Sequence, residues 1–289
     1  MTSEHIMKSV VITGSSSGIG RACALMLDRN GFRVFAGVRR EADGDALRAV
    51  ASESLTPVHI DVADAASIQA MADRVKSEVG DEGLHGLVNN AGTTMPCPIE
   101  YLPLAGFRHQ LEVNLVGPLA VTQALLPVLH RGQGRVVNVT SAAGRAGVPL
   151  MAPYVSAKHG LEGLSDVMRL EFRQLGIQVA VIEPGFVGTA MGGKLQRDTE
   201  AALRTLPDDG RRRYGAALEK VAQEISQQAA TGSPPDVVAE AVLHALTSKK
   251  PRTRYPSGSG AKRMLFMRRL LPDRQFDRIV LRAGGLEGF

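Results

Sequence analysis

Tyr154 and Lys158 stand four residues apart in the stretch PYVSAKHGLEGL, which has the pattern of an amphipathic helix. Four residues are about 1.1 helical turns, so both side chains lie on one face within reach of each other. A phenol with a pKa of about 10 is a poor base at neutral pH, and a neighbouring cation favours its charged form. The pair could therefore exchange a proton with a substrate oxygen. The same spacing, taken alone, is more often a half-buried tyrosine beside a solvated lysine.

Two further polar residues stand upstream of this pair. Ser141 ends the run GRVVNVTS, and its hydroxyl could hydrogen-bond an oxygen whose charge changes during a reaction. Asn114 is polar inside the apolar helical run LEVNLVGPL. On their own, a serine after a strand is usually a turn or cap residue, and such an asparagine is usually a satisfied core amide or marks a helix kink.

A glycine-rich loop near the amino terminus could bind phosphate. The segment VVITGSSSGIG runs from a predicted strand directly into a predicted helix. Glycines allow close approach of a pyrophosphate, and the helix start offers free N–H groups and a positive dipole end. The spacing departs from GxGxxG, because three residues separate the first two glycines. We predict dinucleotide binding here, through Gly14, Ser16, Ser17, Gly18, Ile19 and Gly20.

These residues need a scaffold, and the hydrophobic pattern supplies one. Short β-branched runs at 9–14, 32–38, 56–62, 84–92, 134–141 and 177–185 alternate with helical stretches at 19–29, 43–54, 65–79, 103–131 and 153–175. Nearly continuous apolar runs such as VVIT suit strands that are buried on both faces. The alternation predicts right-handed βαβ units. The expected fold is an α/β single-domain Rossmann-type doubly wound parallel sheet with helices on both faces.

The pattern divides the chain into three parts. Residues 5–189 form the predicted cofactor-binding and catalytic core. Residues 190–233 are polar and helix-prone, with a break at LPDDGRRR, and they follow the sixth strand at the edge where ligands bind in such sheets. We therefore predict a substrate lid there. Residues 234–289 should hold a helix, a short strand in PRTRYPSG and a basic tail.

Five motifs follow one another along the chain: TGxxxGxG at 13–20, NNAG at 89–92, a serine at 141, YxxxK at 154–158 and PG at 184–185. In order and spacing they resemble the short-chain dehydrogenase/reductase family, closely over residues 8 to about 190 and loosely beyond. The resemblance implies an NAD(P)-dependent oxidoreductase that interconverts an alcohol and its ketone or aldehyde.

The resemblance also implies roles for individual residues. Ser141, Tyr154 and Lys158 would be catalytic, with Lys158 also contacting the nicotinamide ribose, and Asn114 would support a water-mediated proton path to the lysine. The remaining expected cofactor contacts are Asp61 and Val62 at the adenine, Asn90, Ala91 and Gly92 at the cofactor-side core, and Pro184, Gly185, Val187 and Thr189, the last at the carboxamide.

The end of the second strand bears on cofactor choice. By resemblance, the acid of NAD-dependent relatives would fall at Val38, and Arg39 falls where NADP-preferring relatives carry a base. A guanidinium suits a 2′-phosphate, so NADP(H) is favoured over NAD(H). In the alternative, Arg39 and Arg40 are merely solvated, and Glu41 or Asp43 binds the ribose.

The expected substrate surroundings are apolar and contain no dedicated anion clamp. This favours a lipophilic substrate that resembles a steroid, a retinoid or an acyl chain. The residues are Met95, Pro96, Val148, Leu150, Met151, Phe186 and Met191.

Composition excludes several other classes. The chain has 289 residues, is 44% hydrophobic, and has neither a window of about 18 consecutive apolar residues nor a signal-like start, so we expect a cytoplasmic protein. Cys23 and Cys97 are the only cysteines, and the histidines have no convergent ligand partners. We therefore expect neither a disulfide nor a metal site.

Charge is concentrated near the carboxyl terminus. Residues 249–282 hold eleven basic and two acidic side chains, a net charge of +9, which leaves about −4 for the rest. We favour a tail helix docked on the body or on a neighbouring subunit, with weak membrane-surface contact as an alternative. Few aromatic residues lie nearby, so no nucleic acid is expected. The resemblance further implies a homodimer or homotetramer.

Two other functions are compatible with a nicotinamide-binding fold. One is a non-catalytic NADP(H)-binding regulatory protein, against which the complete set of Asn114, Ser141, Tyr154 and Lys158 argues. The other is an isomerase or lyase that uses the cofactor transiently, which usually needs a larger carboxyl-terminal domain than the one present here.

Overall fold

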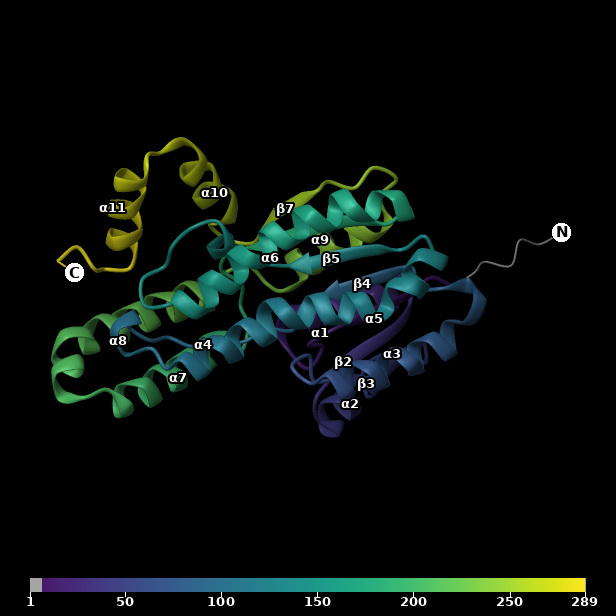
Figure 1. The fold of residues 1–289 in the computed structure, drawn as a ribbon, viewed down its shortest axis with the longest axis horizontal. Helices are drawn as coiled ribbons and strands as arrows, with labels where there is room; N and C mark the ends of the chain where they lie inside the picture. The colour runs from purple at the N-terminus through teal and green to yellow at the C-terminus, as the bar shows by residue number, and fades with distance from the viewer. Residues whose placement is uncertain (1–6, 289) are drawn as a thin grey trace.

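The computed structural model describes residues 7–288, so residues 5 and 6 of the expected core and residue 289 lie outside the described part. Seven parallel strands form one sheet in the order β3-β2-β1-β4-β5-β6-β7. The strands are β1 Ser9–Ile12, β2 Arg33–Val38, β3 Leu55–His59, β4 Gly86–Asn89, β5 Arg135–Val139, β6 Gln178–Pro184 and β7 Arg254–Ser257. The strand order reverses beside β1, which confirms the predicted doubly wound sheet (Figure 1).

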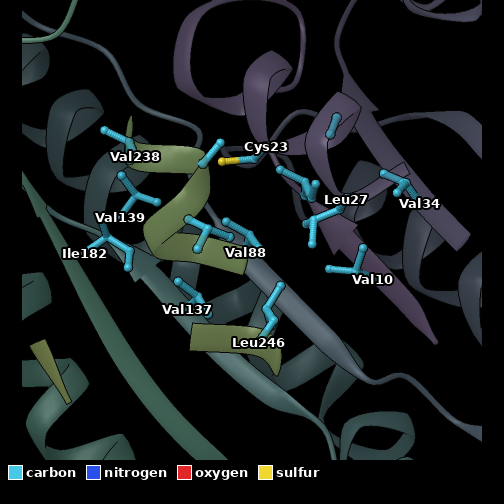
Figure 2. Packing of buried hydrophobic residues seen from close by; sticks show 14 of the residues in the cluster. Val10, Cys23, Leu27, Val34, Val88, Val137, Val139, Ile182, Val238 and Leu246 are labelled. Atoms are coloured by element: carbon cyan, nitrogen blue, oxygen red, sulfur yellow. The ribbon is translucent and has the colours of Figure 1, made fainter. Parts of the chain in front are cut away.

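Alternate residues of each strand enter two different apolar layers. On one face, α1 (Gly18–Arg29) and α9 (Asp236–Thr247) pack on the sheet, and Cys23 and Leu246 meet Val88 in this layer (Figure 2). On the other face, α3 (Ala65–Val79), α5 (Gly117–Arg131) and α6 (Ala152–Glu171) cover the sheet. Because both faces are covered, the strands read as continuous apolar runs in the sequence.

The long helix after β4 consists of three consecutive segments. They are α4 (Leu104–Leu111), a π-helical turn η3 (Glu112–Val116) and α5. Within the described residues, this stretch of 28 residues is the one helix long and apolar enough to span a membrane by composition, and 44% of its most apolar window is buried in the fold. Its inward side belongs to the core, which accounts for much of its hydropathy.

Two predicted helices have different ends from those expected. The helix expected at 43–54 is α2 (Glu41–Arg48), and that expected at 153–175 is α6 followed by a short 3-10 turn η5 (Phe172–Leu175). Gly176 then takes φ +73°, a left-handed conformation that suits glycine, and the chain enters β6. Further 3-10 turns are η1 Gly80–Glu82, η2 Ile99–Tyr101 and η4 Ala142–Gly144.

Residues 190–233 form a helical hairpin that projects from the sheet (Figure 1). Its helices are α7 (Met191–Thr205) and α8 (Asp208–Ala230), and the chain turns between them at Leu206 and Pro207. The two ends of the hairpin are joined, because Gly188 N–H donates to Ser233 O at 2.9 Å. The predicted break and helical character are both present.

The basic tail folds into α10 (Ala261–Leu270) and α11 (Asp273–Ala283). Phe276 is buried, and Leu286 joins an apolar cluster with Leu218 of α8, so the tail is docked on the α7–α8 hairpin, in agreement with the interpretation that we favoured. On its outer side, Phe266 is 64% exposed.

Candidate active site

The sequence-predicted site residues gather at the carboxyl edge of the sheet. The glycine loop follows β1, Arg39 follows β2, Asp61 follows β3, Asn90 follows β4, and Ser141 follows β5. Because all seven strands are parallel, these positions meet at one edge. The segment after β6 and the start of α6 complete the same edge.

The glycine loop has the shape and the free donors that a pyrophosphate needs. Gly14 takes φ +70°, and a Cβ on Gly20 would lie 2.2 Å from the Gly14 carbonyl oxygen, so a side chain has no room there. The cap residue of α1, Ser17, makes no side-chain cap bond, and the first turn contains no acid. The amide groups at the start of α1 are therefore available to a phosphate.

A buried threonine ties this loop to the segment after β4. Thr13 Oγ1 accepts hydrogen bonds from the backbone N–H groups of Asn90 and Ala91, both at 3.0 Å. The Asn90 side chain in turn donates to the carbonyls of Thr13 and Gly14, at 3.0 and 3.1 Å. Asn90 and Ala91 thus hold the loop in shape. Thr13 was absent from our predicted site residues, although it is the first letter of TGxxxGxG.

The end of β2 presents one arginine that is not engaged in an ion pair. Val38 is buried, and Arg40 forms a two-pronged contact with Asp43 at 2.9 and 2.6 Å. Arg39 is exposed and, within residues 7–288, its side chain has no ion pair. Farther along the edge, Asp61 Oδ1 accepts from the backbone N–H of Ala63 at 3.0 Å, and Val62 is buried.

Lys158 and Tyr154 are neighbours, as their spacing predicts. Lys158 is only 4% exposed, its Nζ donates to the Val139 carbonyl at 2.9 Å, and it lies 5.8 Å from the centre of the Tyr154 ring. Burial lowers the pKa of Lys158 to about 8, while the carboxylate of Glu162 acts in the opposite direction. The lysine therefore combines a pKa near the neutral range with a fixed position beside the phenol.

The Tyr154 phenol lies beside the Ser141 hydroxyl. Burial raises the pKa of Tyr154, and its hydrogen bond with Ser141 offsets part of that rise. Ser141 Oγ also accepts from Ala143 N–H at 3.1 Å and so begins η4. The burial of Tyr154 raises the pKa of its phenol, and it therefore opposes the lowering of this pKa by Lys158 that the four-residue spacing predicts.

Asn114 lies in the π-helical turn η3 and is fully buried. Its Oδ1 accepts from Thr93 N–H at 2.9 Å, and its amide donates to Thr93 O at 2.9 Å and Gln110 Oε1 at 3.1 Å. A Cβ on Gly92 would lie 3.0 Å from Asn114 Oδ1 and 3.8 Å from Lys158 Nζ. Asn114 and Lys158 thus converge on Gly92, and Oδ1 keeps one lone pair for a water molecule.

The α7–α8 hairpin, the predicted lid, packs apolar side chains near Tyr154. Leu195 of α7 and Ala222 of α8 are buried in a cluster with Met151, and Tyr154 and Ile225 pack against it. These lid residues were not predicted, because their helical spacing alone does not show what the helices cover.

The residues that we expected to surround the substrate are only partly gathered around Tyr154. Val148 packs against the same cluster, and Leu150 is buried in the adjoining one. Phe186 instead lies beside Gly260, and Met191 is 41% exposed, so a place for these two beside the substrate stays a prediction. The chain turns away at Gly185, where the segment after β6 pairs with Ser259.

A cavity of about 910 Å³ lies between α1 and the α7–α8 hairpin, next to the glycine loop. Gly18 and Thr189 line it, and a Cβ on Gly18 would meet the Thr189 methyl at 3.0 Å. Thr189, in the segment that follows β6, therefore lies against the glycine loop. In the described part of the chain no group of three His, Cys, Asp or Glu residues could hold a metal, and both cysteines are free.

A doubly wound sheet with this loop, serine, tyrosine and lysine at its carboxyl edge defines a nicotinamide-dependent oxidoreductase that acts on CH–OH groups. The short chain dehydrogenase family matches residues 8–200. The chain belongs to this family, whose members use NAD(P).

Curated relatives and solved structures agree with this assignment. The chain is 35% identical over 283 residues to human 17-beta-hydroxysteroid dehydrogenase type 6, covering 96% of this chain and 88% of the relative. It is 38% identical over 280 residues to human retinol dehydrogenase 5, covering 94% and 87%. A short-chain dehydrogenase from Streptomyces avermitilis superposes with a TM-score of 0.76 at 26% identity, over 99% of this chain and 97% of that one.

Proposed function

We propose that the protein is an NADP(H)-dependent oxidoreductase that interconverts a lipophilic alcohol and its ketone or aldehyde, with a substrate that resembles a steroid, a retinoid or an acyl chain. One observation carries the proposal. The Tyr154 phenol lies beside Ser141 and Lys158 and is covered by apolar lid residues, among them Leu195 and Ile225.

The protein's own groups account for the proton in this reaction. When bound, the cofactor supplies a hydride to the substrate carbon or accepts one from it. In the reductive direction, Tyr154 gives its proton to the substrate oxygen while Ser141 hydrogen-bonds that oxygen. The charge of Lys158 stabilises the phenolate that results, and a water at Asn114 Oδ1 would return a proton by way of the lysine.

The exposed guanidinium of Arg39 supports the choice of NADP(H). Val38 offers no carboxylate for a ribose hydroxyl, and the carboxylate of Asp43 is already bound to Arg40. Arg39 is left as an exposed cation at the end of β2, where a 2′-phosphate would lie.

The relatives support the lipophilic substrate. Steroid and retinol dehydrogenases match this chain over nearly its whole length. A steroid or retinoid has the apolar surface that Leu195, Ala222 and Ile225 would bury.

The first experiment measures NADPH consumption with a panel of hydrophobic ketones and aldehydes, and NADP⁺ reduction with the matching alcohols. Tyr154→Phe should lower kcat by about a thousandfold while NADPH affinity stays within about twofold, because only the proton donor is removed. If Tyr154→Phe turned over as fast as the parent, the catalytic assignment would be wrong. Tight NADPH binding without turnover of any substrate would instead favour the regulatory alternative.

The second experiment separates the two cofactors. Arg39→Ala should weaken NADPH binding by about 10- to 100-fold, the loss of a charge-assisted phosphate contact, and should barely change NADH binding. Arg48→Ala is the matched control, because Arg48 is another exposed arginine, paired with Asp45 on α2. Equal losses for NADPH and NADH in Arg39→Ala would contradict the NADP(H) proposal.

Formation of a homodimer or homotetramer and a cytoplasmic location remain predictions. Three exposed apolar residues on η3 and α6 support the first, Val116, Val167 and Leu170. Leu170→Glu should shift the mass found by light scattering toward the monomer, and an unchanged mass would argue against an interface on α6. Cell fractionation tests the location.

A further inference from the structure

A buried ionic network lies directly behind Lys158, on the side of α6 that faces β5, β6 and β7. Glu162 stands one helical turn after Lys158 and is 4% exposed. Its carboxylate accepts a hydrogen bond from Thr140 Oγ1 at 2.6 Å and forms an ion pair with Arg254 of β7. A buried carboxylate is costly unless it is paired, and this one is paired on both oxygens.

The network contacts both the strand end that carries Ser141 and the helix that carries Lys158. Thr140 lies between Val139, whose carbonyl accepts from Lys158 Nζ, and Ser141, which contacts Tyr154. The Thr140 hydroxyl therefore anchors the strand end that carries Ser141 to the helix that carries Lys158. Close packing supports this contact, because a Cβ on Gly144 would lie 3.1 Å from Glu162 Cγ.

We propose that Glu162 is a positioning residue for the reaction, which holds the Ser141 strand end against α6 through Thr140 and keeps Lys158 positively charged through its own buried carboxylate. This inference rests on the proposed function, because it assigns Glu162 a part in the same proton transfer. Arg254 orients the Glu162 carboxylate from the opposite side and links the carboxyl-terminal segment to the catalytic edge.

The surrounding charges are few and can be named. On α6, Tyr154 and Glu162 flank Lys158, and Asp166 follows one turn later, bonded to Arg254 Nη2 at 2.8 Å. From β6, Glu183 lies 3.5 Å from Arg254 Nη1, and from beyond η4, Arg145 lies 3.8 Å from Glu183.

Of these groups, Glu162 is the one whose charge raises the pKa of Lys158, against the burial that lowers it to about 8. Removing the carboxylate should therefore lower the pKa of Lys158 further.

The test titrates Lys158 directly, so that it does not depend on turnover. Protein labelled with ¹³C at lysine Cε is followed by NMR from pH 6 to about 11, and the Lys158 resonance is assigned by its loss in Lys158→Arg. Glu162→Gln, which keeps the size and the hydrogen-bonding capacity of the side chain, should lower the Lys158 midpoint by about one pH unit or more. Glu171→Gln, an exposed residue at the end of the same helix, should leave the midpoint unchanged.

Two further variants separate charge from position. Arg254→Gln leaves the Glu162 charge without its cation and should raise the Lys158 midpoint, opposite to Glu162→Gln. It also keeps the proposal testable if Glu162→Gln does not fold. Thr140→Val keeps the charge and removes the anchor, so it should leave the midpoint unchanged and lower kcat by about tenfold. In kinetics, the fall of reductase activity at high pH should move downward in Glu162→Gln by the same amount as the midpoint.

The outcomes distinguish the two proposals. A Lys158 midpoint that is equal in wild type and Glu162→Gln overturns the inference, whether or not the enzyme turns over. A shifted midpoint in a wild-type chain that reduces no carbonyl compound removes the proposed function and leaves the electrostatic role of Glu162 standing. A shifted midpoint together with a shifted activity profile supports both.

Discussion

Thr13→Val should weaken both the fold and the cofactor site, because one hydroxyl holds the glycine loop to the segment after β4. Valine has nearly the same shape as threonine, so packing is kept and only the hydrogen bonds are lost. The N–H groups of Asn90 and Ala91, each bonded to Thr13 Oγ1 at 3.0 Å, would lose their partner in a site where Thr13 is 2% exposed. At about 1–3 kcal/mol for each of these two unpaired donors, the expected loss is about 2–6 kcal/mol of unfolding free energy.

Urea unfolding followed by circular dichroism measures this loss, and fluorescence titration with NADPH measures the effect on the site. We expect NADPH affinity to fall by about tenfold or more, since the loop that must receive the pyrophosphate is no longer anchored. Thr13→Ser is the matched control, because it keeps the hydroxyl and should restore most of the loss. A Thr13→Val protein within about 0.5 kcal/mol of wild type would refute the reasoning.

Three other predictions follow from the same contacts. The pKa of Lys158 falls from 10.5 to about 8 on folding, so the unfolded chain holds a proton between these pH values that the folded chain has released. The free energy of unfolding should therefore rise with pH through this window. In urea unfolding, wild type should gain up to about 3 kcal/mol relative to Lys158→Met. Parallel curves of unfolding free energy against pH for the two proteins would contradict this. Gly20→Ala places a Cβ 2.2 Å from the Gly14 oxygen and should abolish NADPH binding, whereas Gly163→Ala, whose Cβ meets nothing within 4 Å, should bind normally; normal binding by both would refute the steric argument. Phe276→Ala removes the buried side chain of α11, at a cost of about 3 kcal/mol of unfolding free energy, and should expose the tail to limited proteolysis. Phe266→Ala, at a side chain that is 64% exposed in wild type, should not. Equal cleavage rates for the two variants would count against the docked tail.

Much of the fold could be predicted because its strands are buried on both faces. Val10, Val11 and Ile12 are all fully buried, so β1 reads as an unbroken apolar run that points to a parallel sheet. Helix ends were less certain, since they depend on local contacts. The helix expected to reach residue 54 stops at Arg48, where Ala51 packs on the core and Ser52 hydrogen-bonds Asp28.

The parts of the site that could be predicted are those whose residues lie close together in the sequence. Tyr154 and Lys158 lie on one helix, and the glycine loop is a single turn, so their spacing carries the information. Glu162, Thr140 and Arg254 come from three elements, and Arg254 follows Thr140 by more than a hundred residues. Their contact exists only because β7 joins β6 at the sheet edge. The surroundings of Phe186 and Met191 could not be predicted for the same reason, since the direction of the chain after Gly185 is set by its pairing with Ser259.

The joined ends of the α7–α8 hairpin make it a replaceable module. Val187 and Ser233 pair with each other, so the two ends of the hairpin lie side by side between β6 and α9, while its helices also pack on Met151 and on Leu286 of the tail. Its residues cover Tyr154 but supply none of the proton-transfer groups. A hairpin of different composition that kept the contact with the tail could therefore be grafted between these two positions without changing the strands. Under the proposed function, such an exchange would alter which substrate is accepted and would leave the proton-transfer residues in place.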